Sequence, residues 1–531
     1  MVALPVLIVV SRVFQDTGGA WDHLASTVLP TYIVNTVLLI VGVSVLAGSM
    51  GVTTAWLVTM HRFPGSRILE WALLLPLAVP AYVMAYVFTD LLEFAGPVQS
   101  ALRDMFGWGA RDYWFPRIRS LEGAIVMMSL ALYPYVYLLT RAAFLEQSIC
   151  VLEVSRTLGR GPVRSFFSVA LPLARPAIAA GLALVLMEAI ADYGTVEYFG
   201  VPTFATGIYR TWFGMGEPVA AAQLAAFMMI FVAALLVIER RARGRAKYHH
   251  TTGRYRRINP RPLRGWKAVL ASVSCSLPLI LGFVLPASVL LDYALIEGDA
   301  TWGRGFTQFA WHSLILASVT AAVAIVVATL LAYSVRLNPT RISRFAVRTA
   351  SMGYAVPGSV IAVGVLIPFA GFDNALDAFM QRTFGLSTGL ILTGTIAALV
   401  FAYLVRFLAV SYNTIEASLG KISPAMDHAS RSLGQGPRGT LLRVHAPIMR
   451  GGILTAALLV FVDVMKELPA TLIVRPFNFD TLAIRVYRLA SDERLAEAST
   501  AALTIVAVGV LPVILLSAAI RRSRPGHAPD P

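Results

Sequence analysis

Residues 149–172 read ICVLEVSRTLGRGPVRSFFSVALP, and residues 424–447 read PAMDHASRSLGQGPRGTLLRVHAP. The two stretches lie 275 positions apart and share one order of arginine, glycine and proline. A single match of this kind arises by chance, whereas a register that continues beyond both stretches indicates an internal duplication. Pairs in this register are Arg156 and Arg431, Gly159 and Gly434, Gly161 and Gly436, Pro172 and Pro447, Glu188 and Asp463, and Asp192 and Glu467.

Apolar runs surround both stretches. Of the 531 residues, 57% are hydrophobic and 14% are charged, and the mean hydropathy is +0.70. This composition excludes a large soluble catalytic domain. A helix needs about 20 apolar residues to cross a bilayer. We interpret Ala3–Phe14 as a shortened first span, and eleven further runs have spanning length, near residues 31–58, 72–92, 122–143, 172–195, 219–238, 267–291, 311–335, 349–370, 388–410, 450–472 and 499–519.

Charge is distributed unevenly between the loops. With about 12 spans, both termini lie on one side, and that side carries 31 Lys and Arg against seven Asp and Glu, a balance of +24. The other loops and the spans carry 13 basic and 22 acidic residues, a balance of −9, which accounts for the net charge of +15. Because cytoplasmic loops are rich in Lys and Arg, we expect both termini in the cytoplasm.

Each half of the duplication contains six expected spans, an even number, so the halves have parallel topology. The sequence therefore predicts an all-α integral membrane protein, a polytopic helical bundle of two parallel six-helix repeats. The basic segment between them is interpreted as a cytoplasmic linker beside anionic membrane lipid, in preference to a nucleic-acid site. The expected boundaries are 1–238 for the first repeat, 239–266 for the linker, 267–520 for the second repeat and 521–531 for a cytoplasmic tail.

The duplicated stretches are predicted to be cytoplasmic helix–turn–helix loops, over about 149–170 and 424–446. In the first copy, apolar and polar residues alternate at helical spacing up to Leu158. Gly159 and Gly161 then permit a sharp change of direction, because glycine accepts positive φ at the end of a helix. Pro162 suits the first turn of the next helix.

The spacing of Glu153, Gly159 and Pro172 resembles the EAA loop of ATP-binding-cassette importer permeases, and the second copy keeps that spacing. The resemblance implies that each loop is a rigid knob that sits in a cleft of a separate ATPase subunit and transmits its motion. The second copy departs from the pattern, since His428 stands at the glutamate position. Asp427, one residue earlier, offers a carboxylate from a shifted position.

The chain has no phosphate-binding P-loop sequence, so ATP hydrolysis is expected in a partner subunit. We therefore expect no cofactor on this chain, with ATP and Mg²⁺ used by a cytoplasmic ATPase dimer, and no enzyme activity. The expected coupling residues are Glu153, Arg156, Gly159, Gly161 and Pro172 in the first loop, and Asp427, His428, Arg431, Gly434, Gly436 and Pro447 in the second.

Four longer stretches, residues 71–100, 129–148, 188–214 and 465–494, resemble the fused permeases of ferric iron importers. The resemblance covers nearly the whole chain. It implies a type I importer permease in the bacterial inner membrane, served by a periplasmic ferric-binding protein. The permease of thiamine importers is the alternative within this class. A secondary transporter with six-plus-six spans is the alternative outside it, but the doubled loop has no role there.

Two pairs of acids fall inside expected spans. Glu188 and Asp192 share a helix face at a spacing of four residues, and Asp463 and Glu467 repeat the arrangement. Ionisable groups inside a membrane are costly and usually face a cavity or a partner. We hypothesise that the four acids line the translocation path of a hard cation, which prefers oxygen ligands. The alternative is that they pair with Lys466, Arg475 or backbone groups.

We expect no high-affinity metal site, because tight binding at the middle of the membrane would hinder release. Pro80 and Pro357 occupy corresponding places in the two halves and are candidate gating kinks. The loops 94–120, 196–218 and 474–497 are the candidate contacts for the periplasmic partner.

Overall fold

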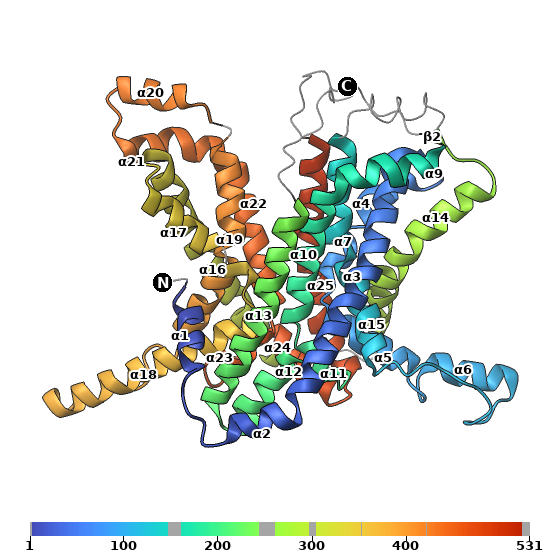
Figure 1. Cartoon of the computed structure of the whole chain (residues 1–531), viewed down its shortest axis with the longest axis horizontal. Helices are drawn as coiled ribbons and strands as arrows, with labels where there is room; N and C mark the ends of the chain where they lie inside the picture. Colours follow the sequence, from blue (N-terminus) through green and yellow to red (C-terminus); the bar gives the residue numbers. More distant parts are fainter. Residues whose placement is uncertain are drawn as a thin grey trace. The chain divides into compact units, whose positions relative to one another are not determined.

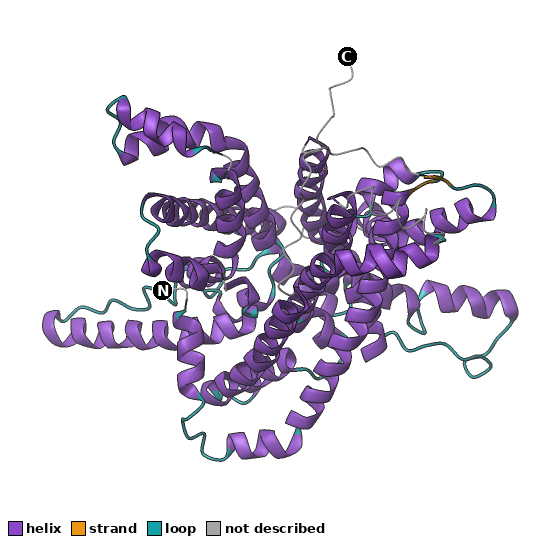
Figure 2. Cartoon of the chain, turned by 45° about the horizontal axis from the view of Figure 1, so that its top comes forward, coloured by secondary structure: helices purple, strands orange, loops and turns teal. Residues whose placement is uncertain are grey.

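The computed structural model describes residues 3–146, 161–243, 261–296, 304–351, 353–420 and 422–522. Most of the described chain is helical, as Figure 2 shows. A single pair of short strands, β1 (His61–Arg62) and β2 (Arg261–Pro262), runs parallel in this part of the chain, with His61 opposite Arg261. The prediction of an all-α polytopic membrane protein is confirmed.

Ten helices of the described chain are long and apolar enough to cross a membrane. A bent pair, in which residues 66–78 meet residues 81–106 at 92°, makes an eleventh span when its two parts are taken as one. The spans are α3 (Leu29–Met60), the bent pair of α4 (Ser66–Ala72) with η1 (Leu75–Ala78) and α5 (Ala81–Leu92) with α6 (Pro97–Phe106), α7 (Leu121–Glu146), α10 (Leu171–Ala191), α13 (Pro218–Arg243), α14 (Trp266–Leu279) with η4 (Ile280–Val284) and α15 (Leu285–Ile296), α16 (Arg304–Leu337), α18 (Gly358–Phe384), α19 (Ile396–Leu419), α22 (Ala446–Met465) and α25 (Leu495–Arg522).

These spans match the eleven long runs expected from the sequence. The predicted first span is the short helix α1 (Leu4–Arg12). Nine residues of helix extend only about 13 Å, less than half of a hydrocarbon core of about 30 Å. The remaining helices are α2 (Ala20–Thr27), α9 (Pro162–Ser165), η2 (Phe166–Ala170), α11 (Gly194–Tyr198), α12 (Phe204–Tyr209), η3 (Arg210–Gly214), α17 (Arg341–Ser351), η5 (Gly353–Ala355), α20 (Pro424–Ser432), α21 (Pro437–Thr440), η6 (Leu441–His445), α23 (Pro469–Val474) and α24 (Leu482–Ser491).

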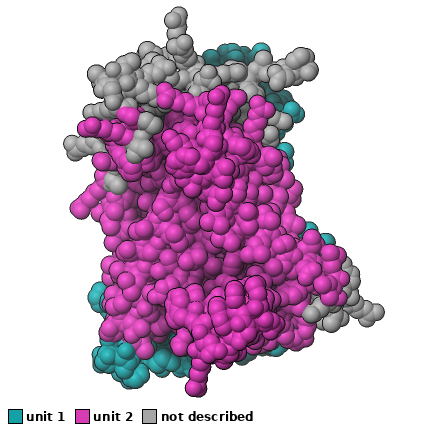
Figure 3. Space-filling view, turned by 90° about the vertical axis from the view of Figure 1, so that its right-hand side faces the viewer, with its two compact units in different colours: residues 1–27, 207–229, 300–488 teal, residues 28–206, 230–299, 489–531 magenta. Residues whose placement is uncertain are grey.

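The chain forms two compact units, coloured separately in Figure 3. Unit 1 comprises residues 1–27, 207–229 and 300–488, and unit 2 comprises residues 28–206, 230–299 and 489–531. The units therefore do not follow the repeat boundaries expected from the sequence. Each unit takes its central spans from one half and its first and last helical segments from the other half.

Close helix packing explains why the first helical segment of each repeat belongs to the unit formed mainly by the other repeat. In unit 1, α1 packs against α18, where a Cβ on Gly364 would lie 2.4 Å from the backbone oxygen of Pro5. Only glycine allows the two backbones to approach so closely. In unit 2, α15 packs against α25. The sequence repeat predicts which segments are related, but not which segments pack together.

Corresponding helices form the core of each unit. In unit 2, α3, α7 and α10 pack together, and in unit 1 their counterparts α16, α19 and α22 do the same. The core of the second group is made of small and branched apolar side chains, among them Ala328, Ala332, Leu408, Ile415, Met449 and Ala456. Small residues let helix backbones approach, which supplies the dispersion contacts that hold membrane helices together.

The packing at Val136 of α7 leads to a first prediction. A Cβ on Gly51 of α3 would lie 2.7 Å from the Val136 Cβ, so G51V forces α3 and α7 apart. Overpacking of this kind costs about 1–3 kcal/mol. We expect a lower apparent Tm of the purified protein. G451A is the control, because a Cβ on Gly451 meets nothing within 4 Å. An unchanged Tm for G51V would contradict the packing described.

Candidate functional site

The second duplicated loop forms the predicted helix–turn–helix. α20 begins at Pro424 and its chain reverses at Gly434, which has φ of 74°. Gly436 then precedes α21, with Pro437 in its first turn. The chain continues through the π turn η6 into α22, where Pro447 lies in the first turn. Figure 1 shows α20 and α21 side by side beyond the end of α22. We call residues 424–446 the second coupling segment.

Most of the first duplicated loop lies outside the described residues, including Glu153, Arg156 and Gly159. Its C-terminal end is described and matches the second copy. The Gly161 carbonyl accepts a hydrogen bond from the Ser165 amide at 2.9 Å, as the Gly436 carbonyl does from Thr440 at 2.9 Å. Pro172 lies in the first turn of α10, as Pro447 does in α22. Both copies therefore begin the short helix after the turn, and the long helix that follows it, in the same way.

Asp427 is turned toward the body of unit 1. Its Oδ2 accepts a hydrogen bond from Nε of Arg336 at 2.9 Å, and its Oδ1 lies 2.6 Å from Nε2 of His445. Its side chain is 15% exposed. Burial opposes ionisation, but the bonds from Arg336 and His445 outweigh it and hold the pKa of Asp427 below its ordinary value. Asp427 therefore does not supply the outward carboxylate considered from the sequence.

The outward face of the second coupling segment carries other residues. His428 and Arg431 are exposed, and Leu433 at the turn is 81% exposed. Met426 and Leu442 are also exposed apolar residues, at 46% and 57%. Exposed apolar side chains around a rigid turn are typical of a surface that contacts another protein.

The membrane-embedded acids of the first half lie in unit 2. Asp192 follows the last residue of α10, and its Oδ1 accepts a hydrogen bond from the Thr195 amide at 2.8 Å. Its Oδ2 accepts from the Thr195 hydroxyl at 3.1 Å. Asp192 thus satisfies the free amide at the start of α11. Glu188 lies one turn earlier and is half-buried.

The acids of the second half have charged partners in unit 1. Asp463 pairs with Lys466 at 3.0 Å. Glu467 pairs with Arg406 at 3.1 Å, both side chains being 6% exposed, and also accepts from the Ala470 amide at 3.0 Å. Arg475 pairs with Asp480 instead. Asp192, Asp463 and Glu467 thus have partners of the kind expected in the alternative interpretation, and the role of the four acids in the translocation path stays a prediction.

Pro80 and Pro357 lie at helix starts, not inside helices. Pro80 precedes α5 with ψ of 143°, and Pro357 precedes α18 with ψ of 144°. Each follows a short 3-10 turn, η1 or η5. The two halves therefore share one interrupted element, because proline lacks the amide that would continue the preceding helix. A gating role for these breaks stays a prediction.

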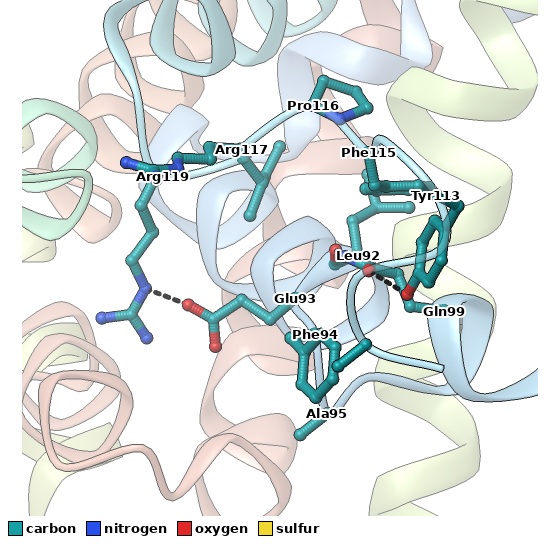
Figure 4. A pocket seen from close by; sticks show the side chains of 12 residues that line it. Leu92, Glu93, Phe94, Ala95, Gln99, Tyr113, Phe115, Pro116, Arg117 and Arg119 are labelled. Atoms are coloured by element: carbon teal, nitrogen blue, oxygen red, sulfur yellow. Dashed lines mark hydrogen bonds and ion pairs between the residues drawn. The ribbon is translucent and has the colours of Figure 1, made fainter. Parts of the chain in front are cut away.

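A cavity of about 680 Å³ lies in unit 2 beneath the loop between α6 and α7 (Figure 4). Arg119 lies at its edge and pairs with Glu93 at 2.5 Å and with Glu493 at 3.1 Å. Tyr113, in the loop between α6 and α7, donates a hydrogen bond to Gln99 at 2.7 Å. The cavity belongs to the loop 94–120 that is a candidate contact for the periplasmic partner. Among the described residues, no group of three His, Cys, Asp or Glu is placed to hold a metal.

The sequence alone did not identify Arg336, Arg406 or His445. Arg336 and Arg406 each bind an acid far along the chain. A signal available for Arg406 and His445 is the loss of the repeat at these two positions. At the offset of 275, Arg406 corresponds to Ala131 and His445 to Ala170.

The buried pair of Arg406 and Glu467 gives a second prediction. R406M leaves Glu467 buried without its counter-ion, and breaking such a pair costs about 3–5 kcal/mol. R406M/E467Q removes both charges, while the carbonyl of the new amide side chain still accepts from the Ala470 amide. We expect a large fall in apparent Tm for R406M and recovery for the double variant. Equal Tm values for R406M and the unsubstituted protein would be inconsistent with the pair.

Comparison with known proteins agrees with this architecture. Residues 22–241 match the family described as binding-protein-dependent transport system inner membrane component. The chain is 28% identical over 487 residues, 91% of its length and 88% of the relative's, to the Fe(3+)-transport system permease protein FbpB 2 of Haemophilus influenzae. It is 23% identical over 415 residues, 75% of its length, to the ferric transport system permease protein FbpB of Actinobacillus pleuropneumoniae, of which the match covers 58%.

A shorter match, 29% identical over 149 residues, is to the molybdenum transport system permease protein ModB of Escherichia coli; it covers 28% of this chain and 62% of that protein. The family match falls on the first half, and the longer relatives extend the similarity over both halves. The helical spans, the duplicated loop and these similarities agree. The chain is a multi-pass membrane protein that is similar, over most of its length, to permeases of binding-protein-dependent transport systems.

Proposed function

We propose that this permease moves ferric iron across the bacterial inner membrane by alternating access. The observation that carries the proposal is the similarity to a ferric permease along 91% of the chain. The acidic side chains at two helix ends support the proposal as well. Ferric iron is a hard cation, and the acids at the ends of α10 and α22 supply oxygen ligands of the matching type. The bound iron is cargo, so weak and transient contacts suit it better than a tight site.

The proposal includes two partners. A periplasmic ferric-binding protein delivers the cargo, and the loop 94–120 around the cavity of unit 2 is a candidate contact. A cytoplasmic ATPase dimer supplies the energy, and the second coupling segment offers it an exposed, structured surface. With both termini in the cytoplasm, the coupling loops face the ATPase, in agreement with the excess of basic residues on that side.

Reconstituted transport tests the proposal. The purified permease is placed in liposomes with the ATPase and binding protein of its own operon, and uptake of radiolabelled ferric iron is measured. We expect uptake that requires ATP inside and the iron-loaded binding protein outside. Ion gradients without ATP serve as the control, because a secondary transporter would respond to them.

Stimulation of ATP hydrolysis by the loaded binding protein identifies the substrate independently of the uptake measurement. A binding protein loaded with thiamine or with molybdate is compared with the iron-loaded one. If only the thiamine- or molybdate-loaded protein stimulates hydrolysis, the iron assignment is wrong while the importer mechanism stands. If uptake follows an ion gradient and ignores ATP, both are wrong.

The four acids Glu188, Asp192, Asp463 and Glu467 are tested together. We expect E188Q/D192N/D463N/E467Q to reduce iron uptake by roughly tenfold or more, since loss of several oxygen charges leaves the cation without screening in a medium where charge is costly. D22N is the control, because Asp22 is exposed on α2 and lies outside the loops proposed to contact the binding protein. Uptake at the unsubstituted rate, with normal amounts of folded protein, would show that the acids serve packing alone.

A further inference from the structure

We propose that Asp427, Arg336 and His445 are positioning residues that hold the second coupling segment in one orientation for the ATPase. The inference rests on the proposed function, since it assigns a role in coupling. All three lie in unit 1. Arg336 is at the end of α16, Asp427 is in the first turn of α20, and His445 is in the π turn η6.

Arg336 joins three segments of the chain. Its Nε donates to Asp427 on α20 at 2.9 Å, and its Nη2 lies 2.9 Å from the same carboxylate oxygen. Its Nη1 donates to the carbonyl of Leu419 at 2.8 Å, and its Nη2 donates to that of Ile422 at 2.9 Å. The last carbonyls of a helix lack partners within the helix, and a cation there is favoured by the helix dipole. Arg336 therefore ties the end of α19 to the start of α20.

His445 completes the arrangement from the other end of the segment. Its side chain is 1% exposed, and Nε2 lies 2.6 Å from Asp427. The edge of its ring meets Tyr333, one turn before Arg336 on α16, with ring centres 5.6 Å apart. Asp427 thus links the beginning of the segment, near α19, to its end, where α22 starts.

Two further bonds fix the hairpin itself. The Tyr333 hydroxyl donates to the carbonyl of Pro437 at 2.7 Å. The hydroxyls of Ser430 and Thr440, both 4% exposed, lie 2.8 Å apart and join α20 to α21. The segment is consequently a rigid hairpin, attached to the ends of α16, α19 and α22 mainly through Asp427.

The first copy of the loop does not contain these residues. At the offset of 275, Asp427 corresponds to Leu152 and His445 to Ala170. The hydroxyl pair does recur in sequence, as Ser155 and Ser165. The glutamate typical of the resembled loops is present in the first copy, at Glu153, and replaced by His428 in the second. We infer that the second copy lacks this glutamate and carries instead an inward carboxylate, Asp427, that positions the segment.

The test uses the complete transporter, with its ATPase and binding protein, and three substitutions. D427N removes the charge but keeps the side-chain size, R336K keeps the charge but loses the planar fork, and H445A removes the second anchor. S334A is the matched control, because Ser334 is exposed on α16 near Arg336, lies outside the coupling segment and donates its hydroxyl within its own helix. ATP hydrolysis is measured on purified, assembled complexes, with and without the iron-loaded binding protein.

We expect the ratio of stimulated to basal hydrolysis to fall by roughly tenfold or more in D427N and R336K, since displacement of a positioned group by about 1 Å has effects of that order. D427E should recover part of the ratio. S334A should keep it. An unchanged ratio in D427N and R336K would overturn the proposal. If the unsubstituted complex is not stimulated at all, the proposed function fails instead, so the two failures are distinguishable.

A distance measurement within the permease tests the proposal even where a variant assembles poorly with the ATPase. Spin labels are placed on the exposed residues Ser334 and Ser432, in a protein that lacks Cys150 and Cys275. We expect one narrow distance distribution in the full-length permease and a broad one in D427N and H445A. Equally narrow distributions in all three would show that Asp427 and His445 do not fix the segment.

Discussion

Every backbone N–H and C=O group inside the hydrocarbon layer must find its partner within the protein, because lipid offers none. This constraint makes the spans of the permease helical and confines irregular backbone to their ends. One break occurs in both halves. Pro80 and Pro357 begin the helix after each break with nearly the same backbone angles. The functional segments described above all lie at such breaks or at helix ends.

The same constraint explains the use of charged side chains at the helix ends. Asp192 and Glu467 occupy equivalent positions after α10 and α22, and each accepts a hydrogen bond from an amide of the following short helix. Glu467 has the additional partner Arg406, whereas the corresponding residue in the first half is Ala131. The two halves therefore keep one backbone plan and differ in the charges that stabilise it.

Much of the fold follows from the sequence. Long apolar runs predict the eleven spans, and the glycines and prolines of residues 424–447 predict the hairpin and its turn at Gly434. These features are local, so local patterns are sufficient. The partners of Asp427 are not local, since Arg336 lies 91 residues away. The packing of α1 against α18 depends in the same way on a distant glycine, Gly364, and no pattern within either segment specifies it.

The central claim is that the second coupling segment is the contact through which the ATPase drives this permease. Cysteine crosslinking in the assembled complex tests it directly. A cysteine replaces Leu433, which is 81% exposed at the turn, or Leu386, which is 61% exposed in the loop before α19. These positions flank opposite ends of that helix. We predict a crosslink to the ATPase from position 433 and none from position 386. A crosslink from position 386 alone would contradict the account.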